Sequence, residues 1–282
     1  MSKLFEKKNP ALHQRLPRSV MTLISRLLRC QYINRELYNM RAIPCRRFPR
    51  ATLDHLGVEL RVDGSVPDPS VSRPVFIANH PLGGLDGLAM LSWMLEQYEQ
   101  VKVPANDVLA TFPHLRPVVA PINQFGSQRN NVNALHECFA SSTAILVFPA
   151  GRTSRPAIVG GRLSDHPWRK MAVRMARIHQ RPLVPVFVSG RNSGLFYGIY
   201  HLRRWLGIRT NLEMFLLVRE MMRPATHRVA LHFGRPIEPS ELETLGADDQ
   251  QRTLRMREMC YCLEPSFHSG LMTCRQTQAQ PE

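Results

Sequence analysis

The sequence predicts an α/β domain in which a mixed β-sheet is flanked by helices and preceded by an amphipathic helical arm. Short apolar runs of strand length, such as residues 75–78, 144–148 and 183–188, alternate with longer segments of helical periodicity. The length of 282 residues suits one such domain with appendages. An apolar fraction of 44% is sufficient for a substantial core.

The predicted arm covers residues 1–55 and is rich in arginine and lysine. Within it, residues 19–30 place five apolar side chains on one helical stripe, while Arg26 and Arg29 lie off that stripe. A basic amphipathic helix that lies in a membrane interface has this pattern. An ordinary helix that packs on the domain has the same pattern, so both interpretations are open.

The main domain is expected over residues 56–240. Its predicted strands are residues 57–64, 75–78, 144–148, 183–188 and 229–233. Its predicted helices are residues 86–98, with Asp86 as N-cap, and residues 133–141, 167–179 and 211–221. A further helix at 248–263 lies in a segment, 241–268, that is expected to pack on the domain. The polar residues 269–282 are expected to form a disordered tail.

Charge narrows the set of partners. The formal net charge is +15, which indicates an anionic partner: nucleic acid, an anionic membrane surface or an acidic protein. Aromatic residues, on which bases stack, make up only 7%, and no nucleic-acid-binding motif is recognised, so nucleic acid is not expected as a partner. No apolar run reaches the roughly 18 residues of a membrane-spanning helix, so the chain is expected to be soluble or peripheral.

Residues able to carry chemistry follow the strand at 75–78. Asn79 and His80 come first, then a glycine-bearing loop, and Asp86 stands at the start of the next helix. A carboxylate bonded to one imidazole nitrogen fixes the tautomer and leaves the other nitrogen free as a base. A histidine near an aspartate is more often structural, so this segment needs support from elsewhere.

That support comes from the strand at 144–148. Gly151, Arg152, Ser154 and Arg155 follow it, and their hydroxyl and guanidinium groups are suited to phosphate or carboxylate. In an α/β sheet, active residues lie on the loops that leave the strand ends. The two polar clusters are therefore expected to belong to one site.

In their order, these segments resemble the motifs of the glycerolipid acyltransferase superfamily, which includes the lysophosphatidic acid acyltransferases. The resemblance rests on NHPLGGLD at 79–86, VFPAGRTSR at 147–155 and LVPVFV at 183–188, and it covers about residues 56–238. Arg129 occupies the place of the family's arginine-bearing second motif. NHPLGGLDG and the segment VFVSGRNSGLF at 186–196 resemble most a bacterial subgroup, the hemolysin-like and amino-acid-lipid O-acyltransferases.

The resemblance implies an acyltransferase in which His80 is the general base and Asp86 orients it. It implies substrate contacts by a set of residues around this pair: Asn79, Arg129, Gly151, Arg152, Ser154 and Arg155. The implied donor is a thioester of acyl carrier protein or coenzyme A, and the implied acceptor is a lyso-phospholipid or a lyso-ornithine or glycine lipid. No metal or other cofactor is expected. With the basic charge, the resemblance predicts a cytoplasmic protein that is peripheral on the inner face of the cell membrane.

Two departures from the family pattern keep alternatives open. Five residues rather than four separate His80 from Asp86, and Ala150 stands where the larger family has glutamate, which puts glycerol 3-phosphate or lysophosphatidate specificity in doubt. The alternatives are an inactive membrane-binding scaffold on the same fold, a hydrolase in which His80 activates water, and a basic nucleic-acid-binding protein. The hydrolase is disfavoured because the G-x-S-x-G nucleophile elbow is absent.

Overall fold

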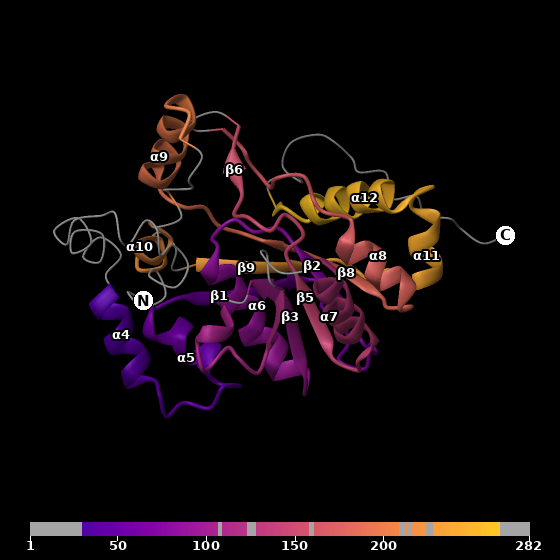
Figure 1. Ribbon diagram of the computed structural model, residues 1–282, viewed down its shortest axis with the longest axis horizontal. Helices are drawn as coiled ribbons and strands as arrows, with labels where there is room; N and C mark the ends of the chain where they lie inside the picture. Colours follow the sequence, from indigo (N-terminus) through magenta and orange to yellow (C-terminus); the bar gives the residue numbers. More distant parts are fainter. Residues whose placement is uncertain are drawn as a thin grey trace.

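The computed structural model describes residues 30–106, 109–122, 128–157, 161–208, 213, 216–223 and 228–265. The predicted helix at 19–30, apart from its last residue, and the predicted tail at 269–282 lie outside these described residues. Figure 1 shows a layered arrangement, in which a central sheet has helices on both faces. This confirms the predicted α/β class.

Seven strands form the sheet in the order β1-β9-β8-β2-β5-β3-β4. They are β1 (Glu59–Gly64), β9 (Arg228–Phe233), β8 (Leu183–Val188), β2 (Val75–Ala78), β5 (Ala144–Val147), β3 (Val101–Asn106) and β4 (Val119–Ile122). The five strands from β8 to β4 are parallel, whereas β9 is antiparallel to β8 and carries β1 parallel to itself. A separate antiparallel ribbon pairs β6 (Arg155–Pro156) with β7 (Leu163–Ser164).

The central strands are apolar along their whole length because helices cover both of their faces. Every residue of β2, β5 and β8 is buried, as is typical of parallel strands between two helical layers. In β2, Val75 and Ile77 belong to one core cluster, and Phe76 and Ala78 belong to the other. Side chains alternate along a strand, so the next two residues, at 79 and 80, are directed to opposite faces.

The two helical layers correspond to these two clusters. One layer contains α4 (Cys30–Asn39), α5 (Phe48–His55) and α6 (Gly84–Gln97). The other contains α7 (Gln128–Ala140), α8 (Met171–Ile178), α11 (Pro239–Thr244) and α12 (Asp249–Cys262). Two further helices, α9 (Gly194–Trp205) and α10 (Leu217–Met221), come between β8 and β9, and a short 3-10 helix spans Leu109–Thr111.

Several predicted boundaries are wrong. The helix predicted at 167–179 begins at Met171, because the indole of Trp168 donates to Asp165 and holds the preceding residues in a turn. Of the helix predicted at 211–221, residues 213 and 216 have 3-10 geometry and Leu217–Met221 form an α-helix, while the other positions lie outside the described residues. The strands β3 and β4 and the helix α9 were not expected from the sequence pattern.

An ion pair joins α12 to α8 and gives the fold a pH-dependent contact. Nε of Arg177 lies 2.9 Å from Oδ1 of Asp249, and this hydrogen bond holds the pKa of Asp249 below its ordinary value of 3.8. A carboxyl with a lowered pKa stabilises the folded state above its ordinary pKa, and that stabilisation is lost as the pH falls through the lowered value.

We therefore expect Asp249→Asn to lower the free energy of unfolding at pH 7 by about 0.5–1 kcal/mol, because both partners are partly exposed. The difference from the parent chain should shrink as the pH falls below 3.8. Urea unfolding at a series of pH values measures both effects. Glu258→Gln on the same helix is the control, because Glu258 is 58% exposed and pairs with Arg255 of its own helix. A difference that is constant with pH would contradict the prediction.

Within the ranges described above, no helix combines the length and the hydrophobicity needed to cross a bilayer.

Candidate active site

His80 lies in the loop that follows β2, and its ring meets the buried start of α6. Nδ1 of His80 lies 2.8 Å from Oδ2 of Asp86. Asp86 is fully buried, whereas the His80 side chain is 20% exposed. The imidazole also stacks on Phe148, with ring centroids 4.3 Å apart. With Nδ1 directed to the carboxylate, Nε2 is the ring nitrogen left for a substrate.

Asp86 holds the loop as well as the ring. Its predicted position as N-cap is wrong: α6 begins at Gly84, with Gly83 as N-cap, and Asp86 is the third helical residue. From there, its carboxylate accepts the backbone N–H groups of Leu82, at 2.9 and 3.0 Å, and Gly83, at 3.1 Å. The five-residue spacing between His80 and Asp86 is thereby compatible with direct contact, because the loop folds back over the carboxylate.

Burial and hydrogen bonding shift the pKa of Asp86 in opposite directions. Burial raises the pKa of Asp86, while the hydrogen bond and charge of His80 and the two backbone N–H groups lower it. A positive charge beside a buried carboxyl group favours its ionised form over its protonated form. The ionised form of Asp86 is therefore favoured most when His80 has taken up a proton.

Gly83 permits the close packing of this loop. Its φ of +79° lies in the left-handed region, and a Cβ there would stand 3.0 Å from side-chain carbons of Leu217 and Thr153. The loop that carries His80 is thus packed between the segment after β5 and α10.

A second buried carboxylate, Asp165, joins the loops and was missed in the sequence. Oδ1 of Asp165 accepts the backbone N–H of His80 at 3.2 Å and the hydroxyl of Ser154 at 2.5 Å, and Oδ2 accepts the indole N–H of Trp168 at 2.8 Å. The backbone N–H of Ser154 donates to the His80 carbonyl at 2.7 Å. Asp165 and Ser154 therefore fix both sides of the His80 backbone.

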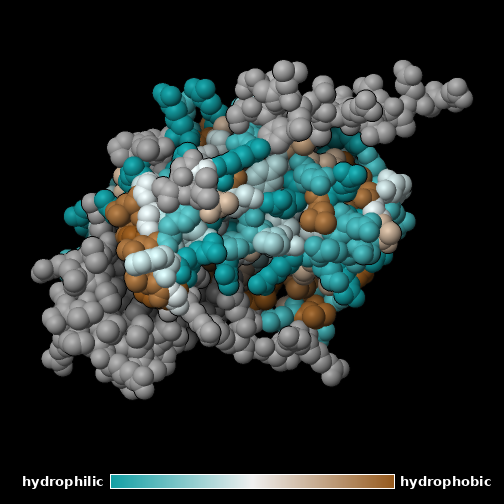
Figure 2. Space-filling view, turned by 90° about the horizontal axis from the view of Figure 1, so that it is seen from above, coloured by the Kyte–Doolittle hydropathy of each residue, from teal (hydrophilic) through white to brown (hydrophobic). Residues whose placement is uncertain are grey.

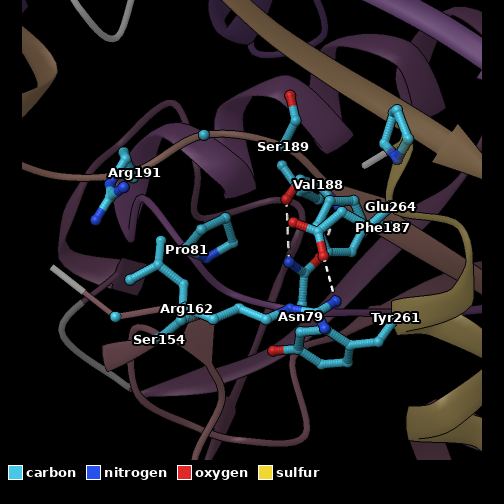
Figure 3. A pocket seen from close by; sticks show the side chains of 14 residues that line it. Asn79, Pro81, Ser154, Arg162, Phe187, Val188, Ser189, Arg191, Tyr261 and Glu264 are labelled. Carbon is cyan, nitrogen blue, oxygen red and sulfur yellow. Dashed lines mark hydrogen bonds and ion pairs between the residues drawn. The ribbon is translucent and has the colours of Figure 1, made fainter. Parts of the chain in front are cut away.

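Asn79 clamps β2 to β8. Its amide nitrogen donates to the carbonyl of Val188 at 3.0 Å, and its amide oxygen accepts the N–H of Val188 at 2.6 Å (Figure 3). Asn79 is 3% exposed. The backbone of Val188 therefore occupies both ends of the Asn79 amide.

Gly151 and Arg152 lie exposed after β5, beside the segment that binds the His80 backbone. The N–H of Gly151 donates to the carbonyl of Phe148 at 3.0 Å, so it is engaged within its own turn. The charge of Arg152 reaches His166, whose pKa is lowered by burial and then by Arg152. Arg152 is therefore a cation in contact with solvent near the candidate base.

Arg155 is directed into the protein instead. It is 7% exposed, and its guanidinium donates to the carbonyl of Thr153 at 2.9 Å and to Glu213 at 3.2 Å. It also lies over the ring of Phe196 in α9, 4.5 Å from the centroid. Burial lowers the pKa of Arg155, and Glu213 opposes this shift. Arg129 falls in α7, and its side chain lies outside the described residues.

Glu213 neutralises two buried arginines. It is 1% exposed and pairs with Arg155 and Arg203. Nε of Arg203 lies 2.9 Å from Oε2 of Glu213. Removing a buried carboxylate leaves its cationic partners uncompensated, which is costly. We expect Glu213→Gln to lower the free energy of unfolding by about 3 kcal/mol.

Thermal or urea unfolding measures this change. Glu241→Gln is the matched control, because Glu241 also pairs with an arginine, Arg235, but at 33% exposure. The control should change stability by less than about 1 kcal/mol. Equal effects of the two substitutions would contradict the prediction.

The loop between β8 and α9 is tied to the same site. The amide nitrogen of Asn192 donates to the carbonyl of Pro81 at 3.1 Å. Ser193 caps α9, and both its N–H and its hydroxyl donate to Glu220 of α10. The loop after β8, α9 and α10 are thus linked to the loop that carries His80.

A pocket of about 530 Å³ lies at this end of the sheet, on the face to which Asn79 is directed (Figure 3). Ser154, Arg162, Arg191 and Tyr261 are among its lining residues. His80 does not line it, because His80 is directed to the opposite face. Among the described residues, no three His, Cys, Asp or Glu side chains gather in the manner of a metal site.

Comparisons with known proteins extend these observations. A family model described as "Acyltransferase" matches residues 3–270. The lyso-glycine lipid O-acyltransferase of Phocaeicola vulgatus is 30% identical over 239 residues, which are 84% of this chain and 85% of that protein. The lyso-glycine lipid O-acyltransferase of Bacteroides thetaiotaomicron is also 30% identical over 239 residues, 84% of this chain and 87% of that protein.

The fold is similar to one solved structure in particular. The 1-acyl-sn-glycerophosphate acyltransferase PlsC from Thermotoga maritima matches with a TM-score of 0.54 at 14% identity, and the match covers 91% of this chain and 100% of that chain. At this identity the likeness concerns the fold alone.

Proposed function

Because the chain belongs to the acyltransferase family, we propose that it transfers a fatty acyl group from a thioester donor to the hydroxyl of a lyso-lipid, with His80 as the general base. The observation that carries this proposal is the 2.8 Å contact between Nδ1 of His80 and the buried Asp86. The contact lies at the carboxyl end of the parallel strands, where α/β proteins bind their ligands.

The acceptor proposed here is an amino-acid lipid of the lyso-glycine type. Two proteins named for that activity align with more than four-fifths of this chain at 30% identity. Ala150, which is buried in an apolar cluster, supplies no carboxylate at the position of the larger family's glutamate. Both observations support an acceptor other than lysophosphatidate.

The reaction needs one base and no covalent enzyme intermediate. Nε2 of His80 takes the proton of the acceptor hydroxyl as its oxygen attacks the thioester carbonyl carbon. The new C–O bond forms, the C–S bond breaks, and the proton on His80 passes to the leaving thiolate. Asp86 stabilises the imidazolium between these two steps.

The other predicted site residues divide between contact and positioning in this proposal. Arg152 is exposed and is suited to an anionic group of the donor or acceptor. Asn79, Ser154 and Arg155 are buried and hydrogen-bonded within the protein, so we assign them to positioning. The N–H groups of Leu82 and Gly83 already donate to Asp86. Other hydrogen-bond donors must therefore stabilise the oxyanion that forms at the thioester carbonyl.

The donor carrier and the location belong to the same proposal. The net charge of +15 is complementary to an acidic carrier protein and to anionic lipids. We propose acyl carrier protein or coenzyme A as the thiol carrier and a peripheral position on the inner face of the cell membrane.

The test is an acylation assay. Purified protein is incubated with palmitoyl thioesters of acyl carrier protein and of coenzyme A, against lyso-glycine lipid, lyso-ornithine lipid and lysophosphatidate, with mass spectrometry of the products. The proposal expects an acylated amino-acid lipid that is absent when His80 is replaced. Thioester loss without any acylated lipid would indicate a hydrolase instead, and no turnover with any pair would reject the proposed reaction.

A further inference from the structure

The outward face of α9 is apolar. Five large apolar side chains that are exposed in the structure lie within fourteen residues of sequence, on or just after this helix: Leu195, Leu202, Trp205, Leu206 and Ile208. Trp205 is 81% exposed, and Leu202 and Leu206 are 53% and 54% exposed. Figure 2 looks down onto the side that carries α9, and hydrophobic side chains gather there at the left of the view.

The inward face of α9 explains why this arrangement is unusual. Phe196, Tyr197 and Tyr200 are buried, and so is Arg203, which pairs with Glu213. A surface helix of a soluble protein normally directs its charged side chains to water and its apolar ones to the core. Here a charged residue is buried while the tryptophan two positions later is in water.

Among the described residues of the segment 189–223, the exposed charges have one sign. Arg191, Arg204 and Arg219 are exposed. The two carboxylates of residues 189–223, Glu213 and Glu220, are each 1% exposed and are paired with arginines. The exposed charge that the described residues of this segment contribute is therefore basic.

We propose that this face, the α9 face (Leu195, Leu202, Trp205, Leu206 and Ile208), docks the protein on an anionic lipid bilayer. A contiguous exposed apolar patch marks an interaction surface. Tryptophan favours the boundary between hydrocarbon and headgroups, and arginines are attracted to anionic lipids. Helices that combine these features lie in the plane of the interface. The partner class rests on the lipid acceptor of the proposed function.

The position of α9 links docking to the site. Ser193 at the start of α9 binds Glu220 of α10, and Asn192 before it binds Pro81 next to His80. A bilayer that holds α9 therefore also holds the loop of the candidate base near the membrane surface, where a lyso-lipid resides.

Trp205 reports directly on this surface. The chain has three tryptophans, and the other two, Trp93 and Trp168, are 6% and 3% exposed. Full-length protein is mixed with vesicles of phosphatidylglycerol and phosphatidylcholine that contain neither lyso-lipid nor thioester. We expect a blue shift of the emission and quenching by brominated lipid, with both effects absent in Trp205→Phe. Vesicles of phosphatidylcholine alone should bind more weakly.

A second variant tests the energetics. Leu202→Ser combined with Leu206→Ser should weaken vesicle binding at least about tenfold, because two large apolar side chains no longer enter the hydrocarbon boundary. The matched control is Leu254→Ser on α12, whose leucine is 49% exposed, and it should bind as the parent does. Circular dichroism of each variant is the check that it is folded.

The outcomes separate this proposal from the proposed function. Vesicle binding with unchanged Trp205 emission would assign membrane contact to another surface and overturn the proposal. A dimer that the double leucine variant abolishes, without vesicle binding, would also overturn it. Docking through Trp205 without acyl transfer to any lyso-lipid would support the docking face and reject the enzymatic proposal.

Discussion

Replacing His80 by alanine should lower the rate of acyl transfer by roughly 10²–10⁴-fold, because the general base is lost. His80→Gln should be equally slow, although glutamine can still donate a hydrogen bond to Asp86. The glutamine variant keeps a hydrogen-bond donor beside the buried carboxylate of Asp86. Its inactivity therefore could not be attributed to a cavity or to an unpaired carboxylate. Steady-state rates with saturating thioester and lyso-lipid measure the effect.

The control for His80 is another partly exposed histidine. His55 on α5 is 40% exposed and pairs with Glu36, away from the loops of the site. His55→Ala should retain the parent rate. Retention of activity within about threefold in His80→Gln would exclude His80 as a base, since general bases contribute far more than that.

Replacing Asp86 by asparagine should lower the turnover number by about 10²–10⁴-fold with little change in KM. The asparagine oxygen, at the position of Oδ1, can still accept the N–H of Leu82, whereas the N–H of Gly83, which donates to Oδ2, loses its acceptor. Its amide N–H₂ then faces Nδ1 of His80, which favours the tautomer with the proton on Nε2, and that nitrogen can no longer act as a base. The split between turnover number and KM is the measurement.

Asp86→Ala separates this effect from folding. It leaves the two backbone N–H groups of the loop without their acceptor, so we expect a loss of about 1–3 kcal/mol of stability in addition. If Asp86→Asn unfolds as readily as Asp86→Ala and regains the parent turnover number at low temperature, Asp86 has a structural role only.

The sequence predicted the five neighbouring strands from β1 to β5 and missed only β3 and β4 at the opposite edge of the sheet. The strands β2, β5 and β8 are continuous apolar runs, and all three were expected. By contrast, β3 and β4 contain Pro104 and Pro121 without the long apolar run that surrounds Pro185 in β8, and proline in a run counts against a strand. Helix α9 begins with Gly194 and contains Gly198, so its segment resembles a loop when the packing of its aromatic residues on Arg155 is unknown.

In the candidate site, too, some residues were predicted from the sequence and others were not. His80 and Asp86 were found because they are close in sequence and follow a strand, and the geometry brings them into contact. Asp165 lies 85 positions after His80 in a turn-like segment, and nothing local distinguishes it from a solvated aspartate. The role of Glu213 likewise becomes apparent only from its ion pairs with Arg155 and Arg203. Pairings over such separations are created by the fold and leave no periodic signal.

The central place of β2 in the sheet has a consequence for the timescale of motion at His80. β2 is the fourth of seven strands, and Asn79 ties its end to β8. Amide protons in such a strand exchange with solvent deuterium only when the whole domain opens, whereas peripheral helices exchange through small local openings. We therefore expect His80 to be attached to a slowly exchanging part of the molecule and α9 to a part that opens more readily, so that contact with lipid can move α9 while the base stays in place.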